Sequence, residues 1–292
     1  MWSRADMAAR RKALKSLFVP RASTDALAAL IDKVRADRDA LSEPTCVLIT
    51  GETGVGKSTF LRRYVAENPG RREAGCLVQP VIYDELQSKM TILAAAQSLA
   101  CKLQDPSRGR GNLADLTRRV IQQLGAQRTE VVINDEYQHI LETGTITVNK
   151  VADWYKQVAK AANVPFVLAG MPSAARLIES HEQFADITPY RCALGEFDWG
   201  SQTGRKAFRE FLARADAALP FDGVAGLADK EIAIALYEAS GGRLRPLMRL
   251  IKQAALHALE RGSANVEWGD LAYGYEHIEP ADPRADSPFA SM

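Results

Sequence analysis

The chain has 292 residues, of which 47% are hydrophobic and 25% are charged, and its 37 Lys and Arg residues nearly balance its 36 Asp and Glu residues. This composition is globular and long enough for one large or two modest domains, which excludes collagen-like, disordered and disulfide-scaffold proteins. No apolar run approaches the roughly 20 residues of a membrane span, and we expect no secretory signal in the basic N-terminus. The four cysteines lack metal-ligand spacing, so we expect reduced thiols, no zinc site and a cytoplasmic protein.

Charge is unevenly distributed along the chain. Residues 1–38 carry nine basic and four acidic side chains, residues 86–128 carry seven and two, and residues 267–292 carry one and six. Such segregation indicates either a surface that faces phosphate groups, with an acidic tail for partners, or long basic side chains that solvate helix faces. Charge alone does not separate these two interpretations.

Strand and helix patterns alternate over the first 200 residues. Apolar, β-branched runs predict buried parallel strands, and amphipathic spacing predicts the helices between them. The alternation predicts an α/β layer with a parallel sheet flanked by helices. The predicted strands are 45–50, 77–83, 130–134, 164–169 and 191–197, and the predicted helices are 24–37, 58–67, 92–102, 113–124 and 148–162.

Beyond residue 200 the strand patterns stop, and helical patterns remain at 203–217, 229–239 and 245–260. This change predicts a small C-terminal helical domain. The last residues are polar and contain several prolines, which is typical of a disordered tail. We therefore expect four parts: a basic N-terminal segment 1–22, an α/β domain 23–200, a helical domain 201–265 and an acidic, disordered tail 266–292.

Residues 51–58 match the phosphate-loop pattern G-x-x-x-x-G-K-[S/T] and lie between a predicted strand and a predicted helix. Glycines let the backbone N–H groups surround the β-phosphate, and the helix that follows adds its positive end. We expect Lys57 to reach the β- and γ-phosphates and Ser58 to coordinate Mg²⁺. The sequence thus predicts ATP binding by Gly51, Glu52, Thr53, Gly54, Val55, Gly56, Lys57, Ser58 and Thr59.

A second acidic motif, Asp135-Glu136, follows the predicted strand 130–134. Ligands of open α/β sheets bind at the carboxyl ends of the strands. We expect Asp135 to hold Mg²⁺ through water and Glu136 to orient and deprotonate the attacking water. An acidic pair that merely ends a strand is the alternative, but behind a phosphate loop the pair favours a Mg²⁺-dependent ATPase over a simple nucleotide binder.

The run Ser240-Gly-Gly-Arg-Leu-Arg245-Pro resembles the sensor-2 element of AAA+ ATPases, in which an arginine at a helix start is aimed at the γ-phosphate. The resemblance implies a helical lid and a catalytic role for Arg245, with Arg243 as the alternative; the planar fork of arginine can pair with two phosphate oxygens. Sensor 1 should end the strand 164–169, yet the expected Asn or Thr is missing unless Ser173 substitutes. That departure implies slow hydrolysis.

The AAA+ resemblance also implies two elements at the edges of the nucleotide site. Arg191 matches the arginine finger that acts on a neighbouring subunit's ATP, which implies an oligomer; Arg176 is the less well placed alternative. The segment 18–21 corresponds to the region that wraps adenine, which implies binding roles for Val19 and Arg21. A plain packing role for this segment is the alternative.

Five short sequence segments (strings) together resemble the TniB/TnsC group of transposition ATPases. They are the N-terminal entry segment Val-Pro-Arg-Ala (19–22), the phosphate loop, Asn-Asp-Glu-Tyr-Gln-His (134–139), Ala-Gly-Met-Pro-Ser-Ala (169–174) and Phe-Asp-Trp (197–199). The resemblance implies a regulator that oligomerises on duplex target DNA as a ring or filament and recruits a transposase and a TniQ-type adaptor. ATP hydrolysis would then control disassembly. A helicase loader or initiator-like ATPase, or a nucleotide-switch scaffold, is the alternative.

DNA contacts are expected from basic side chains on loops that line such an assembly. Contacts of this kind are mainly ion pairs to phosphates, so binding should be independent of sequence and weaken steeply with salt. The candidates are Lys89, Lys102, Arg118, Arg119 and Lys150.

Overall fold

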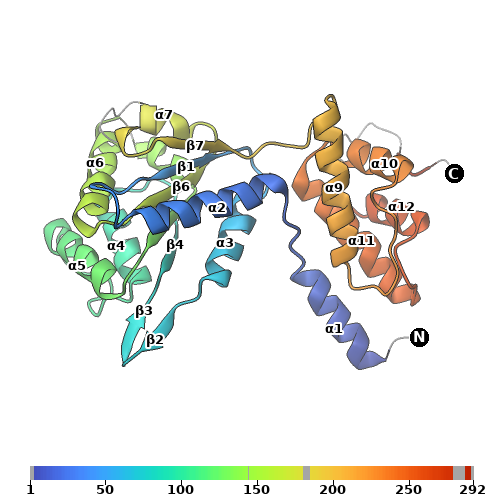
Figure 1. Ribbon diagram of the computed structural model, residues 1–292, viewed down its shortest axis with the longest axis horizontal. Coiled ribbons are helices and arrows are strands. Elements are labelled where there is room, and N and C mark those ends of the chain that lie inside the picture. The colour runs from blue at the N-terminus through green and yellow to red at the C-terminus, as the bar shows by residue number, and fades with distance from the viewer. Residues whose placement is uncertain (1–2, 144, 180–184, 279–286, 291–292) are drawn as a thin grey trace. The chain divides into compact units, whose positions relative to one another are not determined.

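The computed structural model describes residues 3–143, 145–179, 185–278 and 287–290 and divides into two compact units (Figure 1). The α/β unit comprises residues 26–53 and 57–194. The helical unit comprises residues 1–25, 54–56 and 195–292. Three residues of the phosphate loop therefore belong to the same unit as the C-terminal helices.

A five-stranded parallel sheet, with the strand order β4-β5-β6-β1-β7, is the centre of the α/β unit. Strands β5 and β6 are buried at every position, as continuous apolar runs predict, whereas the edge strand β7 has no fully buried residue. The parallel α/β fold predicted from the sequence is confirmed. The strands are β1 (Val47–Thr50), β4 (Val81–Glu85), β5 (Val131–Asp135), β6 (Phe166–Gly170) and β7 (Tyr190–Ala193).

The register of the sheet aligns the carboxyl ends of its central strands. Thr50 of β1 is opposite Gly170 of β6, and Asn134 of β5 is opposite Leu168 of β6. Because the strands are parallel, the segments that follow β1, β5 and β6 leave the sheet at the same edge. The start of the phosphate loop and the acidic pair are thus brought together there.

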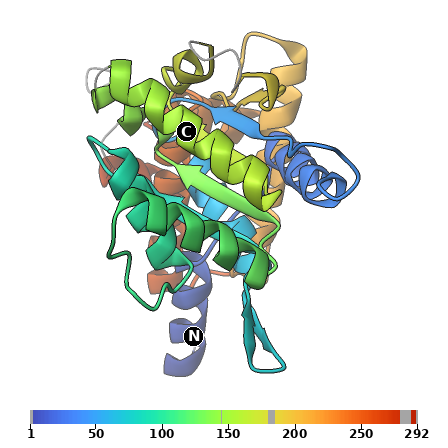
Figure 2. The same cartoon turned by 90° about the vertical axis from the view of Figure 1, so that its left-hand side faces the viewer.

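Helices cover both faces of this sheet (Figures 1 and 2). Helices α4, α5 and α6 gather on one face, and α2 and α3 lie on the other. Tyr155 packs edge-on against Tyr137 and Phe166, with ring centroids 5.8 and 5.3 Å apart, and the indole of Trp154 donates to Thr117 Oγ1 at 2.9 Å. Trp154 and Tyr155 are therefore core residues. The elements are α2 (Ala22–Asp37), α3 (Lys57–Glu67), α4 (Ile92–Lys102), α5 (Leu113–Ala126), η1 (Tyr137–Thr143), α6 (Thr145–Ala162) and α7 (Ala174–Glu179).

The strand predicted over 77–83 is divided in the structure. Strands β2 (Arg71–Glu73) and β3 (Cys76–Val78) form a separate hairpin, and β4 begins after Pro80. Proline has no N–H to donate to a ladder, so Pro80 interrupts the run. Ala74 and Gly75 have φ values of 48° and 83°, the left-handed pair of a two-residue hairpin turn.

The helical unit is built from α1 (Arg4–Lys15), α9 (Gln202–Ala218), α10 (Lys230–Ser240), α11 (Leu244–Arg261) and α12 (Trp268–Glu276). Phe208, Phe211 and Leu247 are among the residues of its buried core. Helix α1 belongs to this unit, where Arg10 pairs with Asp222 and Arg11 with Glu260. Part of the basic charge of the N-terminal segment is thus paired within the unit. Among the described residues, no helix combines the length and the apolar character needed to cross a bilayer.

The prediction of a disordered tail over 266–292 is wrong for its first part, because Trp268–Glu276 forms helix α12. Leu271 and Tyr275 are buried in the core of the helical unit. Asp270 is also buried, accepting hydrogen bonds from the Glu267 N–H at 2.9 Å and from Arg261 at 3.0 Å, and it lies 2.6 Å from His257 Nδ1. The segment therefore forms a helix despite its polar composition, because its spaced apolar residues are buried and the Asp270 carboxylate is hydrogen-bonded.

Replacing Asp270 should destabilise the helical unit. Burial raises the pKa of Asp270, but hydrogen bonds from Arg261, the Glu267 N–H and His257 outweigh burial and leave the pKa lowered. A lowered pKa means that the stabilisation is present above the unfolded value near 4 and is lost as the pH falls through the folded value below it. We expect Asp270→Ala to lower the free energy of unfolding at pH 7 by about 2 kcal/mol, from a lost helix cap and charged hydrogen bonds. Urea unfolding at pH 7 and pH 3 checks this, with the exposed Glu276→Ala as the control; an equal loss at both pH values would contradict it.

Candidate nucleotide site

The phosphate loop adopts a backbone that requires glycine at two positions. Gly54 and Gly56 have φ values of 89° and 97°, in the left-handed region that other residues rarely adopt. A Cβ at Gly56 would lie 2.6 Å from Leu244 Cδ2, and one at Gly54 would lie 3.3 Å from Arg245 Cβ. Conformation and close approach together explain the glycines of the motif, and a backbone of this kind suits a phosphate cradle.

Lys57 is the buried cation of the loop. It is only 7% exposed, and its Nζ donates to the carbonyl oxygens of Gly51 at 2.5 Å and Glu52 at 3.1 Å. Helix α3 begins at Lys57, so the N–H groups of its first turn and the Ser58 hydroxyl also lie at the end of the loop. The N–H groups of a helix start and a lysine amine attract anions, so the residues present fit a polyphosphate.

Asp135 is buried and is held in place by two hydrogen bonds. Its Oδ2 accepts from the Tyr83 hydroxyl at 2.8 Å and its Oδ1 from the Glu136 N–H at 3.0 Å. Burial, together with the negative charge of Asp135, raises the pKa of Tyr83, which therefore remains a donor. Hydroxyl and carboxylate oxygens such as those of Ser58 and Asp135 are donors that Mg²⁺ accepts, so this set fits the metal. Tyr83 was missed in the sequence, although a tyrosine near the end of a predicted strand was the available signal.

Glu136 has an unusual backbone conformation for a residue other than glycine, with a φ of 60°. Gln138 Nε2 donates to Glu136 Oε2 at 2.5 Å, and Gln138 Oε1 accepts from the Met171 N–H at 2.9 Å. His139 Nε2 is farther away, 3.9 Å from the same carboxylate oxygen. Sequence reasoning assigned Gln138 no role, although it stands in the string 134–139. The structure thus connects that string to the string 169–174.

Arg245 lies beside the phosphate loop within the helical unit. It is the second residue of α11, its side chain is exposed, and its N–H donates to the Gly54 carbonyl at 3.1 Å. Arg243 stands at the N-cap position of the same helix. The geometry therefore favours Arg245 over Arg243 as the arginine next to the loop.

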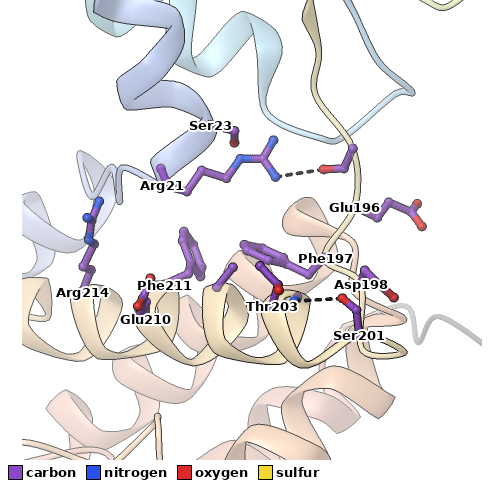
Figure 3. Close-up of a pocket in the computed structure, with 14 residues that line it drawn as sticks. Arg21, Ser23, Glu196, Phe197, Asp198, Ser201, Thr203, Glu210, Phe211 and Arg214 are labelled. Atoms are coloured by element: carbon purple, nitrogen blue, oxygen red, sulfur yellow. Dashed lines mark hydrogen bonds between the residues drawn. The ribbon is translucent and has the colours of Figure 1, made fainter.

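Val19 and Arg21 have packing roles in the helical unit. Val19 is buried in its core, and the Arg21 guanidinium donates to the carbonyls of Gly195 at 2.9 Å and Val55 at 2.7 Å. Burial lowers the pKa of Arg21. Arg21 borders a cleft of about 410 Å³ within this unit, where Phe197 and Phe211 line its wall (Figure 3). Arg21 thus ties the entry segment to the phosphate loop.

Arg191 lies within edge strand β7, opposite Leu48 of β1. Its side chain is 43% exposed and pairs with Glu179 of α7 at 3.3 Å. Arg176 is on the same short helix and is exposed. The prediction that Arg191 acts on a neighbouring subunit stays a prediction.

The structure separates the five DNA-contact candidates. Lys89 precedes α4 and Lys102 ends it, so about 20 Å of helix and flanking chain lie between them. Lys89, Lys102 and Lys150 are exposed, and Arg118 is 65% exposed with Asp115 as an ion-pair partner. Arg119 differs, because its guanidinium donates to Asp105 at 3.1 Å and to the Arg110 carbonyl at 2.5 Å. Arg119 therefore holds a loop.

That loop, residues 104–112 between α4 and α5, is organised around Asp105, whose carboxylate is buried. Asp105 accepts hydrogen bonds from the Gly109 N–H and from Gln123, each at 3.1 Å, as well as from Arg119. Burial raises the pKa of Asp105, but these hydrogen bonds and the charge of Arg119 outweigh burial and leave the pKa lowered. The fixed loop presents the exposed side chains of Arg108 and Arg110. Both were counted in the basic segment 86–128 but were not singled out.

Comparisons with known proteins identify a matching family model and solved structures with a similar fold. Residues 38–178 match the family model of an AAA domain. A comparison with curated protein sequences found no match. The Aeropyrum pernix ORC2 protein, in ADPNP and ADP complexes, is 14% identical, with a TM-score of 0.65 over 92% of this chain and 71% of that one. The Aeropyrum pernix ORC1 protein in complex with DNA is 17% identical, with a TM-score of 0.62 over 92% and 69%.

A third similar structure is that of CDC6p from Pyrobaculum aerophilum, which is 13% identical with a TM-score of 0.61 over 91% of this chain and 70% of that one. At such identities the likeness concerns the fold alone. The parallel sheet, the phosphate loop, the acidic pair and the match of residues 38–178 to an AAA domain together show a P-loop fold of the AAA+ type and an ATPase.

Proposed function

We propose that this AAA+ ATPase is initiator-like: it binds duplex DNA, assembles into an oligomer when it holds ATP, and uses hydrolysis to control release. The observation that carries the proposal is the loop 104–112, in which the buried Asp105 and Arg119 fix a backbone that presents Arg108 and Arg110. The likeness in fold to the Aeropyrum pernix ORC2 and ORC1 proteins, the latter solved in complex with DNA, supports the same class.

In the nucleotide site, residues 51–59 would hold the phosphates of ATP, with Lys57 as the buried cation. Ser58 and Asp135 would hold Mg²⁺, which neutralises charge on the phosphate oxygens when it is bound. Glu136 would orient and deprotonate the attacking water. Arg245, whose backbone N–H donates to the Gly54 carbonyl, would pair with the γ-phosphate.

Two further roles complete the proposal. Arg191, partly exposed on edge strand β7, would reach the ATP of a neighbouring subunit, so hydrolysis would require an oligomer. The entry segment with Val19 and Arg21 would support the adenine side of the site through the bond from Arg21 to Val55. The oligomer would be a ring or filament on DNA.

The DNA contacts would come from Lys102, Arg108, Arg110 and Arg118, with Lys89 and Lys150 as further exposed candidates. Arg119 would act indirectly, because its guanidinium is bound to Asp105 and to the Arg110 backbone. Preorganisation reduces the entropy lost on binding, since the loop is already ordered. Contacts to phosphates alone would give binding that is independent of sequence.

The double variant Arg108→Ala/Arg110→Ala tests these contacts. We expect duplex-DNA affinity to fall at least tenfold and the slope of log K against log salt to decrease by about 2, because two phosphate contacts are lost. ATP affinity should stay unchanged. Fluorescence anisotropy with labelled duplex at several salt concentrations measures both quantities, with Lys206→Ala, 77% exposed on α9, as the control. Unchanged binding at every salt concentration would eliminate these contacts.

A regulator of DNA transposition is the second candidate, favoured by the strings 134–139 and 169–174, which meet at Gln138 and Met171. Its partners would be an integrase-type transposase and a TniQ-type adaptor. A complex with a hexameric helicase would favour the loader type instead, and a complete lack of DNA dependence would favour a nucleotide-switch scaffold. Pull-downs with the two kinds of partner, with ATP and duplex DNA present, discriminate between them.

A further inference from the structure

The carboxamide of Gln138 bridges two parts of the nucleotide site. Gln138 is in η1, directly after the acidic pair, and it joins Glu136 Oε2 to the Met171 N–H beyond β6. The Met171 N–H can only donate, so it must face the amide oxygen. The amide –NH₂ is then left to face the carboxylate, and the orientation of the bridge is fixed by its chemistry.

The end of β6 has no side chain because Gln138 occupies that space. A Cβ at Gly170 would lie 2.4 Å from Gln138 Oε1 and 3.1 Å from Ala174 Cβ. No positive φ is involved at Gly170, so what the glycine provides is room for the Gln138 amide in its observed position. The strand end thus has no polar side chain of its own, and the Gln138 amide from η1 occupies the corresponding place.

The backbone of Glu136 also needs such a support. A φ of 60° is sparsely populated by residues other than glycine and persists where the surroundings hold it. The Glu136 N–H is bound to Asp135 Oδ1, and the Glu136 carboxylate is bound to Gln138. Both ends of the residue are thus fixed before any nucleotide binds.

We propose that Gln138 is a positioning residue for ATP hydrolysis. Its amide holds Glu136 Oε2 toward the end of β6, so that Oε1 is directed to the attacking water. Gln138 thereby takes over the task of a polar residue at the strand end. The inference rests on the proposed role of Glu136 as the base.

The first test is Gln138→Ala. Misplacing a catalytic group by about 1 Å can cost about 100-fold, so we expect a 10- to 100-fold lower kcat. ATP affinity and KM should stay within about twofold, because the phosphate loop is untouched. ATP titration confirms that the variant is folded, and Gln253→Ala, exposed on α11, is the matched control. A wild-type kcat in Gln138→Ala would overturn the inference.

Gln138→Glu gives a readout that a purely structural role would not move. The ionised carboxylate that this substitution introduces cannot donate to Glu136 and repels it, so kcat should fall strongly at pH 8. At lower pH the new carboxyl group becomes protonated and can donate again. The ratio of variant to wild-type kcat should therefore rise as the pH falls from 8 to 5. A ratio that does not change with pH contradicts the proposal.

Gly170→Ala perturbs the same bridge from its other side. The added methyl group would displace the Gln138 oxygen, so kcat should fall as in Gln138→Ala, and the two changes should be far from additive in the double variant. Additive effects would overturn the inference.

Glu136→Gln separates the role of Glu136 as the base from the positioning role of Gln138. If Glu136→Gln hydrolyses ATP at the wild-type rate, the assignment of Glu136 as the base fails. If Glu136→Gln is inactive and Gln138→Ala is fully active, only the role of Gln138 is removed.

Discussion

Lys57→Ala should abolish useful ATP binding, with an affinity at least 100-fold below that of the wild type. The amine is buried between the carbonyls of Gly51 and Glu52, at the point where the loop meets α3. A charged hydrogen bond contributes about 1.5–3 kcal/mol, and the wild-type amine is expected to make more than one to the β- and γ-phosphates. Isothermal titration with ATP and Mg²⁺ measures the loss.

The control for this variant is Lys33→Ala, since Lys33 is exposed and pairs with Asp37 on α2. Circular dichroism on both variants establishes that the fold is intact, because the Lys57 amine also holds two carbonyls of the loop. An ATP affinity within twofold of the wild type would remove the phosphate loop as the nucleotide site.

Glu136→Gln should retain ATP binding and lose hydrolysis. Removing a general base costs about 10²- to 10⁴-fold in rate, and the amide has nearly the same shape as the carboxylate. Its oxygen can still accept the hydrogen bond from Gln138, so the local geometry should persist. We expect kcat to fall about 10³-fold with an unchanged Kd for ATP.

The same variant should trap the assembled state on DNA. If hydrolysis controls release, a protein that holds ATP without cleaving it stays bound, and its dissociation from duplex slows in proportion to the lost kcat. Stopped-flow dissociation and negative-stain microscopy follow this effect. Glu67→Gln, an exposed residue paired with Arg63, is the control. Fast dissociation with intact ATP binding would disconnect hydrolysis from release.

The sheet and the phosphate site could be predicted from the sequence because their signals are local. Continuous apolar runs identify strands buried on both faces, and β5 and β6 are buried throughout. The glycine-rich loop is equally local, because its conformation depends on glycine at positions 54 and 56. Pro80 and the turn at Ala74 and Gly75 were also local signals, but the prediction of a single strand over 77–83 did not take them into account.

Helix α12 shows where local composition misled. The segment 266–292 is polar and acidic, yet Leu271 and Tyr275 pack into the helical unit and Asp270 finds three partners inside it. Partners distant in sequence decide whether such a carboxylate is solvated or buried. Composition reports only the average of the segment.

The sequence by itself determined the class of chemistry: a phosphate loop after one strand and an acidic pair after another, which a parallel sheet brings to one edge. The tertiary structure decided which of the polar and charged side chains are bound to partners within the protein. It showed that Arg119 holds a loop, that Arg21 binds backbone carbonyls, and that Gln138 occupies the space above Gly170. The physical reason is that charge and hydrogen-bonding capacity belong to a residue type, whereas the partner that satisfies them is set by register and packing between segments far apart in the chain.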